Sequence, residues 1–218
     1  MGPDTQLCGT VSAESSTMTA EVLKLHLGCF DQATKGWINT DITPHLWVAR
    51  VPGLPRLLFR IGKITRDRLE QHKRGVFKEL TYLDVTKRFP YSDETFDFVF
   101  SCHMLEHLFV HEAQACIADI FRVLKSGGIC RIVVPDLDKI VADYNPDQPE
   151  LFLKKIFECD PQSRNAHHWH YNANSLLRVL RDAGFHEAYQ CAYRQGRCPD
   201  LESLDNRADE SCFVEAIK

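Results

Sequence analysis

Several carboxylate, hydroxyl, thiol and imidazole side chains, which can bind ligands or transfer protons, follow apolar runs in this sequence. Asp41, Asp84 and Asp136 each come at the end of an apolar segment, and Ser101-Cys102-His103 follows the run FDFVF at residues 96–100. A carboxylate in such a place can accept hydrogen bonds from both hydroxyls of a ribose. A histidine, with an ordinary pKa near 6.5, suits proton transfer at neutral pH. These residues predict a ligand site that includes a general base.

Short strands must position these residues. The run 96–100 is rich in aromatic and β-branched residues, which favours a buried strand, and a helix is expected after it from Met104. Residues 23–27 and 37–42 predict two earlier strands, and residues 129–134 predict a buried strand interrupted by Arg131. In open α/β sheets ligands bind outside the carboxyl ends of the strands. The candidate residues all fall at such ends.

Helices are expected between these strands. Residues 111–124 carry one apolar stripe, made by Ala113, Cys116, Ile117, Ile120, Phe121 and Leu124. Residues 125–128 (KSGG) predict a helix stop with glycine at the C-terminal cap. Another helix is expected over 175–185, and residues 186–194 and 211–217 predict a final hairpin around a polar loop. Asp136 either lies on the rim of the site or caps a helix that starts near Leu137.

Four segments, in the same order, resemble the motifs of class I S-adenosylmethionine (SAM)-dependent methyltransferases of the methyltransferase type 11 kind. Residues 83–108 are similar to the family's FP…FD.V.S..VLEHL run, and residues 23–43 resemble its first cofactor-binding motif. Residues 122–138 and 175–185 resemble its R.LKPGG…PD and L..LL..AGF segments. The arrangement GC….GWIN.DI is also similar to a subgroup of methyltransferases from glycan and natural-product pathways.

The resemblance implies a fold, a cofactor and site residues. The fold is a Rossmann-like α/β domain: a seven-stranded, mostly parallel sheet with helices on both faces and an antiparallel last strand. The cofactor is SAM, with Gly28 and Cys29 toward its methionine part, Asp41 at the ribose and Asp84 at the adenine. The remaining expected cofactor contacts are Ile42, Val85, Ser101, Cys102 and His103, the last near the sulfonium.

Two features depart from the family pattern. Only the first glycine of the usual G-x-G-x-G is kept, and Phe30 stands where the second is expected. The next strand also begins only a few residues later, whereas a parallel crossover normally takes about a dozen residues or more. The connection is therefore expected to be a short helical turn or an irregular link.

Residues 44–79 are strongly basic. Their acidic residues are Asp67, Glu70 and Glu79, against the basic residues Arg50, Arg56, Arg60, Lys63, Arg66, Arg68, Lys73, Arg74 and Lys78. This asymmetry favours a lid-like insertion over an anionic substrate with a phosphate or carboxylate. The alternative is a solvated helical face with Trp47, Leu57, Leu58 and Phe59 packed beneath it. A membrane-surface or partner-binding role is also open.

Three histidines, His167, His168 and His170, cluster before Tyr171. Metal coordination together with Asp136 is one interpretation, but adjacent side chains do not easily converge on one ion, so no metal is expected. The related subgroup often has His-x-Trp-x-Tyr here, which implies a pocket wall with His167 as general base and Asp136 as second candidate. Glu106-His107 matches the family's usual pair, which is expected to pack on the sheet.

Composition narrows the partners and the compartment. The 218 residues fit a leader over 1–20, expected to be disordered, and one domain over 21–218. A net charge of −4 gives no basic footprint for nucleic acid. No apolar run approaches the roughly 20 residues of a membrane span, and residues 1–20 lack the apolar core of a signal peptide. Nine cysteines without a CxxC pair favour free thiols in a reducing, cytoplasmic setting.

The predicted function is therefore a SAM-dependent methyltransferase (EC 2.1.1.-) acting on a small molecule that is anionic or glycosylated. A homodimer is compatible with this prediction. A hydroxyl of a sugar, glycolipid or secondary metabolite is the preferred acceptor, and an N-methyltransferase is an alternative. A non-catalytic SAM-binding or partner-binding protein is a second alternative, favoured by Phe30. Base methylation is disfavoured because Ser-Cys-His-Met replaces the usual Asn/Asp-Pro-Pro-Tyr, and a nicotinamide dehydrogenase because G-x-G-x-x-G is missing.

Overall fold

The computed structural model describes residues 21–163 and 165–218, so the expected leader over 1–20 lies outside the described residues. Its centre is a seven-stranded sheet in the order β3-β2-β1-β4-β5-β7-β6. The strands are β1 (Lys24–Leu27), β2 (Ile38–Asp41), β3 (Thr81–Tyr82), β4 (Phe96–Cys102), β5 (Leu124–Pro135), β6 (Glu187–Cys191) and β7 (Ser211–Ile217). Strand β7 runs antiparallel to both its neighbours, and every other pair is parallel.

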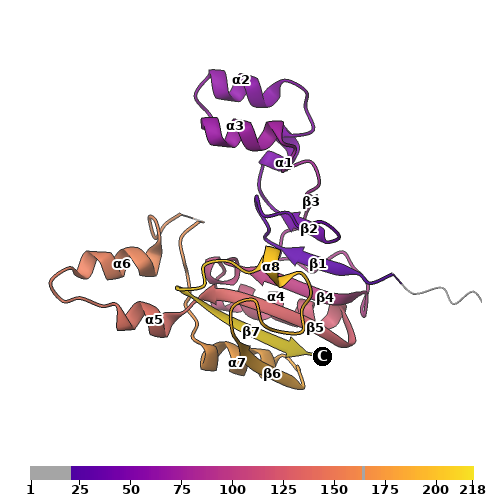
Figure 1. Cartoon of the computed structure of the whole chain (residues 1–218), viewed down its shortest axis with the longest axis vertical. Coiled ribbons are helices and arrows are strands. Elements are labelled where there is room, and N and C mark those ends of the chain that lie inside the picture. The colour runs from indigo at the N-terminus through magenta and orange to yellow at the C-terminus, as the bar shows by residue number, and fades with distance from the viewer. Residues whose placement is uncertain (1–20, 164) are drawn as a thin grey trace, which may run out of the picture.

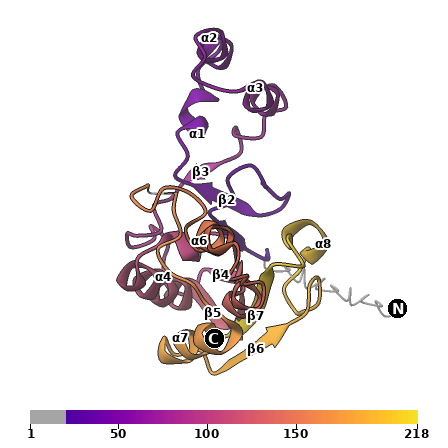
Figure 2. The same cartoon turned by 90° about the vertical axis from the view of Figure 1, so that its left-hand side faces the viewer.

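Helices lie on both sides of this sheet (Figures 1 and 2). The helices of the described residues are α1 (His45–Val48), α2 (Leu54–Arg60), α3 (Arg66–Lys73), the 3-10 turn η1 (Leu105–His107), α4 (Val110–Val123), α5 (Leu137–Ala142), α6 (Pro149–Phe157), α7 (Ala173–Asp182) and α8 (Leu201–Leu204). On one face, Ile117 of α4 and Leu180 of α7 join the main apolar core. On the other face, Leu201 and Leu204 of α8 join Phe100 in a second core.

This architecture confirms the expected Rossmann-like α/β fold, with a mostly parallel seven-stranded sheet and an antiparallel last strand. The expected stripe lies on α4, where Ala113, Cys116, Ile117 and Ile120 are buried. Strands β6 and β7 form the expected hairpin, and α8 lies in the loop between them. The eight cysteines among the described residues are free thiols. None of the helices in the described ranges has the length and apolar character needed to cross a bilayer.

The expected glycine cap after α4 is wrong. The cap residue is Leu124, whose backbone is already extended (ψ 139°), and β5 begins at that same residue. Leu124 pairs with Phe96 of β4, so strand pairing takes over where the helix stops. Gly127 and Gly128 therefore lie inside β5, where the Gly127 N–H donates to the Lys218 carbonyl (2.8 Å).

An irregular link, without a helix, connects the parallel strands β1 and β2. The side chain of Asn39 holds it in place. Its Oδ1 accepts from the Thr34 N–H, and its Nδ2 donates to the Thr34 carbonyl, both at 2.9 Å. Two side-chain hydrogen bonds thus do the positioning that a crossover helix would otherwise do.

Residues 44–79 form α1, α2 and α3, which extend away from the sheet beyond β2 and β3 (Figure 1). The alternative interpretation, in which apolar side chains pack beneath a solvated helical face, is wrong for three residues. Trp47 is 52% exposed, Leu57 54% and Phe59 37%. Helix α2 buries none of its residues. A small core of Cys29, Leu46, Phe77 and Leu80 joins the base of this segment to the domain.

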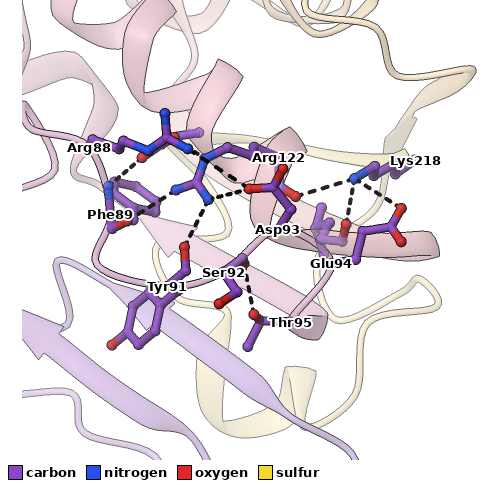
Figure 3. A network of polar contacts seen from close by, with 11 residues as sticks. Arg88, Phe89, Tyr91, Ser92, Asp93, Glu94, Thr95, Arg122 and Lys218 are labelled. Atoms are coloured by element: carbon purple, nitrogen blue, oxygen red, sulfur yellow. Dashed lines mark hydrogen bonds and ion pairs between the residues drawn. The ribbon is translucent and has the colours of Figure 1, made fainter.

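The loop before β4 is held by Arg122 of α4 (Figure 3). The guanidinium donates to the carbonyls of Tyr91 (2.8 Å) and Phe89 (3.1 Å) and to the carboxylates of Asp93 (2.8 Å) and Asp119 (2.7 Å). One arginine thereby satisfies backbone groups that no strand pairs, and it fixes how the chain enters β4.

Candidate functional site

The sequence-predicted cofactor residues lie at the carboxyl ends of four strands that are neighbours in the sheet. Along the order β3-β2-β1-β4, these ends carry in turn Asp84 and Val85, Asp41 and Ile42, Gly28 and Cys29, and Ser101, Cys102 and His103. All four strands are parallel, so these ends meet along one edge. Residues that are far apart in the sequence are therefore brought side by side at the edge where α/β sheets bind ligands.

Asp41 organises the turn after β1. Its Oδ2 accepts from the N–H of Phe30 (2.9 Å), and its Oδ1 accepts from the N–H of Thr43 (2.6 Å). Burial raises the pKa of the Asp41 carboxyl, although these two backbone N–H groups stabilise its charged form. Phe30 is left-handed (φ +44°), a conformation that glycine adopts without strain. The missing second glycine is thus compensated by a hydrogen bond to Asp41.

Gly28 is also left-handed (φ +62°) and lies directly beneath Met104. A Cβ at this position would lie 2.5 Å from Cγ of Met104. The adjacent Cys29 turns its thiol into the small core with Leu46, where burial raises its pKa. The backbone of this turn, rather than the thiol, is what a ligand would meet.

The other strand ends differ in their polar groups. Asp84 uses Oδ1 to accept from the N–H (3.0 Å) and the hydroxyl (2.7 Å) of Thr86. Ser101 is fully buried, and its hydroxyl has no hydrogen-bond partner among the described residues. His103 is left-handed (φ +49°), and its Nε2 lies 2.8 Å from Oγ of Ser211. The helix expected from Met104 is only the turn η1, because the backbone is extended at Leu108 and Phe109, and α4 begins at Val110.

A histidine-carboxylate cluster adjoins this edge. Glu106 and His107 of η1 and His167 each offer a ligand atom, and these three atoms lie within 4.8 Å of one another. Glu106 is fully buried, and neither of its carboxylate oxygens has a hydrogen-bond partner in the described part of the chain. Its backbone carbonyl accepts from the N–H groups of His168 (2.8 Å) and Trp169 (3.2 Å). Sequence reasoning missed this role for Glu106, for which the only signal was the Glu-His pair itself.

His167 is buried and oriented by a carboxylate. Its Nε2 lies 2.8 Å from Oε2 of Glu158, while its Nδ1 has no partner among the residues described. Burial lowers the pKa of His167, an effect that Glu106 and Glu158 oppose. The nearby Tyr171 is also buried, and burial, reinforced by Glu106, raises its pKa to about 12. A neutral imidazole with a lone pair on Nδ1 can accept a proton or a metal ion.

Asp136, the second candidate base, caps α5. Its Oδ1 accepts from the N–H of Asp138 (3.1 Å), which agrees with the expectation that Asp136 caps a helix starting near Leu137. It also forms a β-bridge with Tyr171, which brings the end of β5 beside the histidine segment. Asp136 is not a member of the Glu106–His107–His167 cluster. The structure therefore does not support a metal site that combines Asp136 with the histidines of residues 167–170.

A basic hollow of about 750 Å³ lies in the segment 44–79. Its lining includes Arg50, Arg56, Lys73 and Lys78 together with the buried faces of Leu69 and His72. None of the described residues that line it carries a carboxylate. Its chemistry therefore suits an anion.

A family model matches about a third of the chain. Residues 62–132, which run from just after α2 into β5, are similar to the methyltransferase domain family. No curated protein matches the chain.

Three solved structures illustrate what this chain is similar to, and only the first has a TM-score above 0.5. A possible exported protein from Bordetella parapertussis is 15% identical with a TM-score of 0.52, over 91% of this chain and 62% of that one, so the chain spans less than two thirds of it. A SAM-dependent methyltransferase from Thermotoga maritima, named as a possible histamine N-methyltransferase, is 14% identical with a TM-score of 0.49, over 92% and 84%. PigF, solved with SAH, is 16% identical with a TM-score of 0.49, over 90% and 50%.

Proposed function

We propose that this protein is a SAM-dependent methyltransferase that acts on a small molecule. The observation that carries the proposal is the row of Asp84, Asp41, Gly28 and His103 along four adjacent strand ends. The methyltransferase domain match over 62–132 supports it independently. Asp84 offers a carboxylate for the adenine side and Asp41 a carboxylate for the ribose. Gly28 offers a turn without a side chain, and His103 a polar side chain at the end of β4.

The residues of this edge fit SAM. The partly exposed Asp41 keeps acceptor capacity beyond its two backbone hydrogen bonds, and Ile42 beside it exposes 58% of its surface as an apolar contact for a ribose or adenine. Asp84 and Val85 would flank the adenine. Only glycine leaves room at position 28, and the Ser101 hydroxyl is a buried polar group in need of a partner. Cys29 would contribute its backbone, and Cys102 and His103 would lie near the sulfonium.

When bound, SAM supplies a methyl group already activated on a positively charged sulfur. The chain itself must align the acceptor, exclude water and accept a proton, and alignment alone is worth several kcal/mol, up to about 7–11. We favour a hydroxyl acceptor, whose oxygen gains the methyl carbon while the sulfur keeps the electron pair of the broken bond. The hydroxyl proton then passes to the protein. His167 is the first candidate base because its Nδ1 lone pair has no partner among the described residues, and Asp136 is the second.

The basic hollow supports an acceptor with an anionic group. Arg50, Arg56, Lys73 and Lys78 would hold a phosphate or carboxylate through segment 44–79, which would then act as a lid. A sugar, glycolipid or secondary metabolite with such a group is our preferred acceptor. The free thiols of the described cysteines support a reducing compartment such as the cytoplasm.

A non-catalytic SAM-binding or partner-binding protein is the second candidate. It is favoured by Phe30 at the left-handed glycine position and by the exposed apolar residues Trp47, Leu57 and Phe59. Large exposed apolar side chains commonly mark a surface that another molecule covers.

Calorimetric titration with SAM and with S-adenosylhomocysteine tests the proposal. We expect the wild-type chain to bind both, and Asp41→Asn to lose binding while still melting cooperatively. The matched control is Asp182→Asn, because Asp182 is an exposed carboxylate at the end of α7. No binding by the wild type would reject the cofactor site. Binding without turnover on any anionic acceptor, across sugars, glycolipids and metabolites, would favour the second candidate.

A further inference from the structure

The cluster of Glu106, His107 and His167 is unusual because it contains a buried carboxylate without a hydrogen bond from any described residue. Glu106 is 0% exposed, and both of its carboxylate oxygens lack a hydrogen bond within the described ranges. A buried carboxylate without hydrogen bonds or a counter-charge costs several kcal/mol or more. His103 is close, with its Nδ1 3.3 Å from Oε1 of Glu106, but the contact lacks hydrogen-bond geometry. The described residues therefore leave both oxygens of this carboxylate without a hydrogen bond.

Both histidines of the cluster are held by their outer nitrogen. Nδ1 of His107 lies 3.2 Å from the carbonyl of Ala166, which can only accept, so Nδ1 carries the proton and Nε2 keeps a lone pair. Nε2 of His167 lies 2.8 Å from the Glu158 carboxylate, so this nitrogen is the donor and Nδ1 keeps a lone pair. A backbone carbonyl and a carboxylate are the usual partners of the outer nitrogen in metal-binding histidines.

We propose that Glu106, His107 and His167 bind a divalent transition-metal ion of the zinc class. Two imidazoles and one carboxylate are a known donor set for catalytic zinc, in which a fourth position stays open. Ligand atoms around tetrahedral zinc lie about 3.4 Å apart, so atoms at the present limit of 4.8 Å would have to approach one another by about 1.4 Å. We expect rotation of the three side chains to supply this movement when the ion binds.

The open position gives the ion a role in the proposed methyl transfer, and this role rests on the proposed function. An acceptor oxygen bound there would lose its proton more readily, because a bound cation stabilises the oxyanion. Nδ1 of His167 would then be a ligand rather than the base, and the acceptor proton would pass to Asp136, the second candidate base. Metal binding itself does not depend on SAM, so the two proposals can fail separately.

The test uses the full chain, stripped of metal with a chelator and titrated with Zn²⁺ by calorimetry. We expect one ion per chain, and a binding constant at least about 100-fold weaker in Glu106→Gln, His107→Ala and His167→Ala, since even second-shell losses cost about 10–100-fold. Glu158→Gln should fall in that second-shell range. His186→Ala removes an exposed histidine and is the matched control, with unchanged affinity expected.

Co²⁺ provides an independent readout, because a bound ion with nitrogen and oxygen ligands should give a visible absorption band that the three variants lose. Thermal melting shows whether each variant is folded. The proposal is overturned if the wild type binds no ion, or if folded Glu106→Gln and His167→Ala bind as tightly as the wild type. Asp41→Asn should still bind the metal ion while it loses SAM. If the wild-type chain binds the metal ion but not SAM, the proposed function is rejected and the metal site stands.

Discussion

Arg131 of β5 and Glu215 of β7 are direct partners in the antiparallel register, with Nη1 and Oε1 3.1 Å apart. Both side chains are fully buried. Arg131 also donates to Asp205 from Nε (2.8 Å) and Nη2 (2.5 Å). Glu215 in turn accepts from the backbone N–H of Cys198 (3.0 Å). These charges tie the loop that carries α8 to the sheet.

Arg131→Leu should lower the free energy of unfolding by about 3–5 kcal/mol, because it leaves two carboxylates buried without a cation. Chemical denaturation measures the change. The matched control is Arg194→Leu, which breaks the exposed pair with Glu202 and should change stability by no more than about 1 kcal/mol. Equal effects of the two substitutions would contradict this account of the buried network.

Arg122→Ala should release the loop before β4. Because the guanidinium donates to Phe89, Tyr91 and Asp93, we expect a loss of about 2–3 kcal/mol in the free energy of unfolding. Hydrogen exchange should become faster at the amides of residues 89–95. Arg178→Ala, on the exposed face of α7, controls for the loss of an arginine and should leave these amides protected.

His26 should make stability depend on pH. Burial lowers its pKa to about 4 in the folded chain, against about 6.5 when unfolded, so the unfolded chain binds more protons between these values. Stability from this residue is therefore lost as the pH falls through that window, by about 3 kcal/mol in total. The ring contacts Phe100 edge-on, and His26→Phe should keep the packing and flatten the pH profile. Urea unfolding at several pH values checks this, with the exposed His186→Phe expected to keep the wild-type slope.

Gly28→Ala should weaken SAM binding at least about tenfold, an effect of about 1.4 kcal/mol. The new methyl group would meet Met104 at 2.5 Å in a left-handed turn. Gly62→Ala is the matched control, because Gly62 has a similar φ (+70°) with nothing within 4 Å of its added Cβ. Both variants carry the backbone strain, and only Gly28→Ala should lose affinity in calorimetry.

The parts of the fold that sequence could predict are those set by local pattern. The alternating and apolar runs around His26 and Val99 specify strands, and the stripe through Ile117 specifies α4, so the row of strand ends followed from the sheet order of the resembled family. Two other features depend on distant contacts. The link after β1 is held by Asn39, and Glu106 is enclosed by a segment about sixty residues further along. No local pattern shows that Leu57 stays exposed, because this depends on how segment 44–79 is attached.

From Ile129 to Pro135, β5 pairs residue by residue with β7, and from Ile129 to Val133 it also pairs with β4, so this stretch is intolerant of changes in length. Side chains alternate between the two faces of a strand, so one residue inserted between Ile129 and Cys130 would shift the rest of β5 by one position against its neighbours. Arg131 would then point toward α4 and Ile132 toward α8, which would put a cation in the apolar core and an isoleucine among carboxylates. Variation in chain length among related sequences should therefore fall in the loops around α8 and α2, where an inserted residue does not move strand side chains from one face of the sheet to the other.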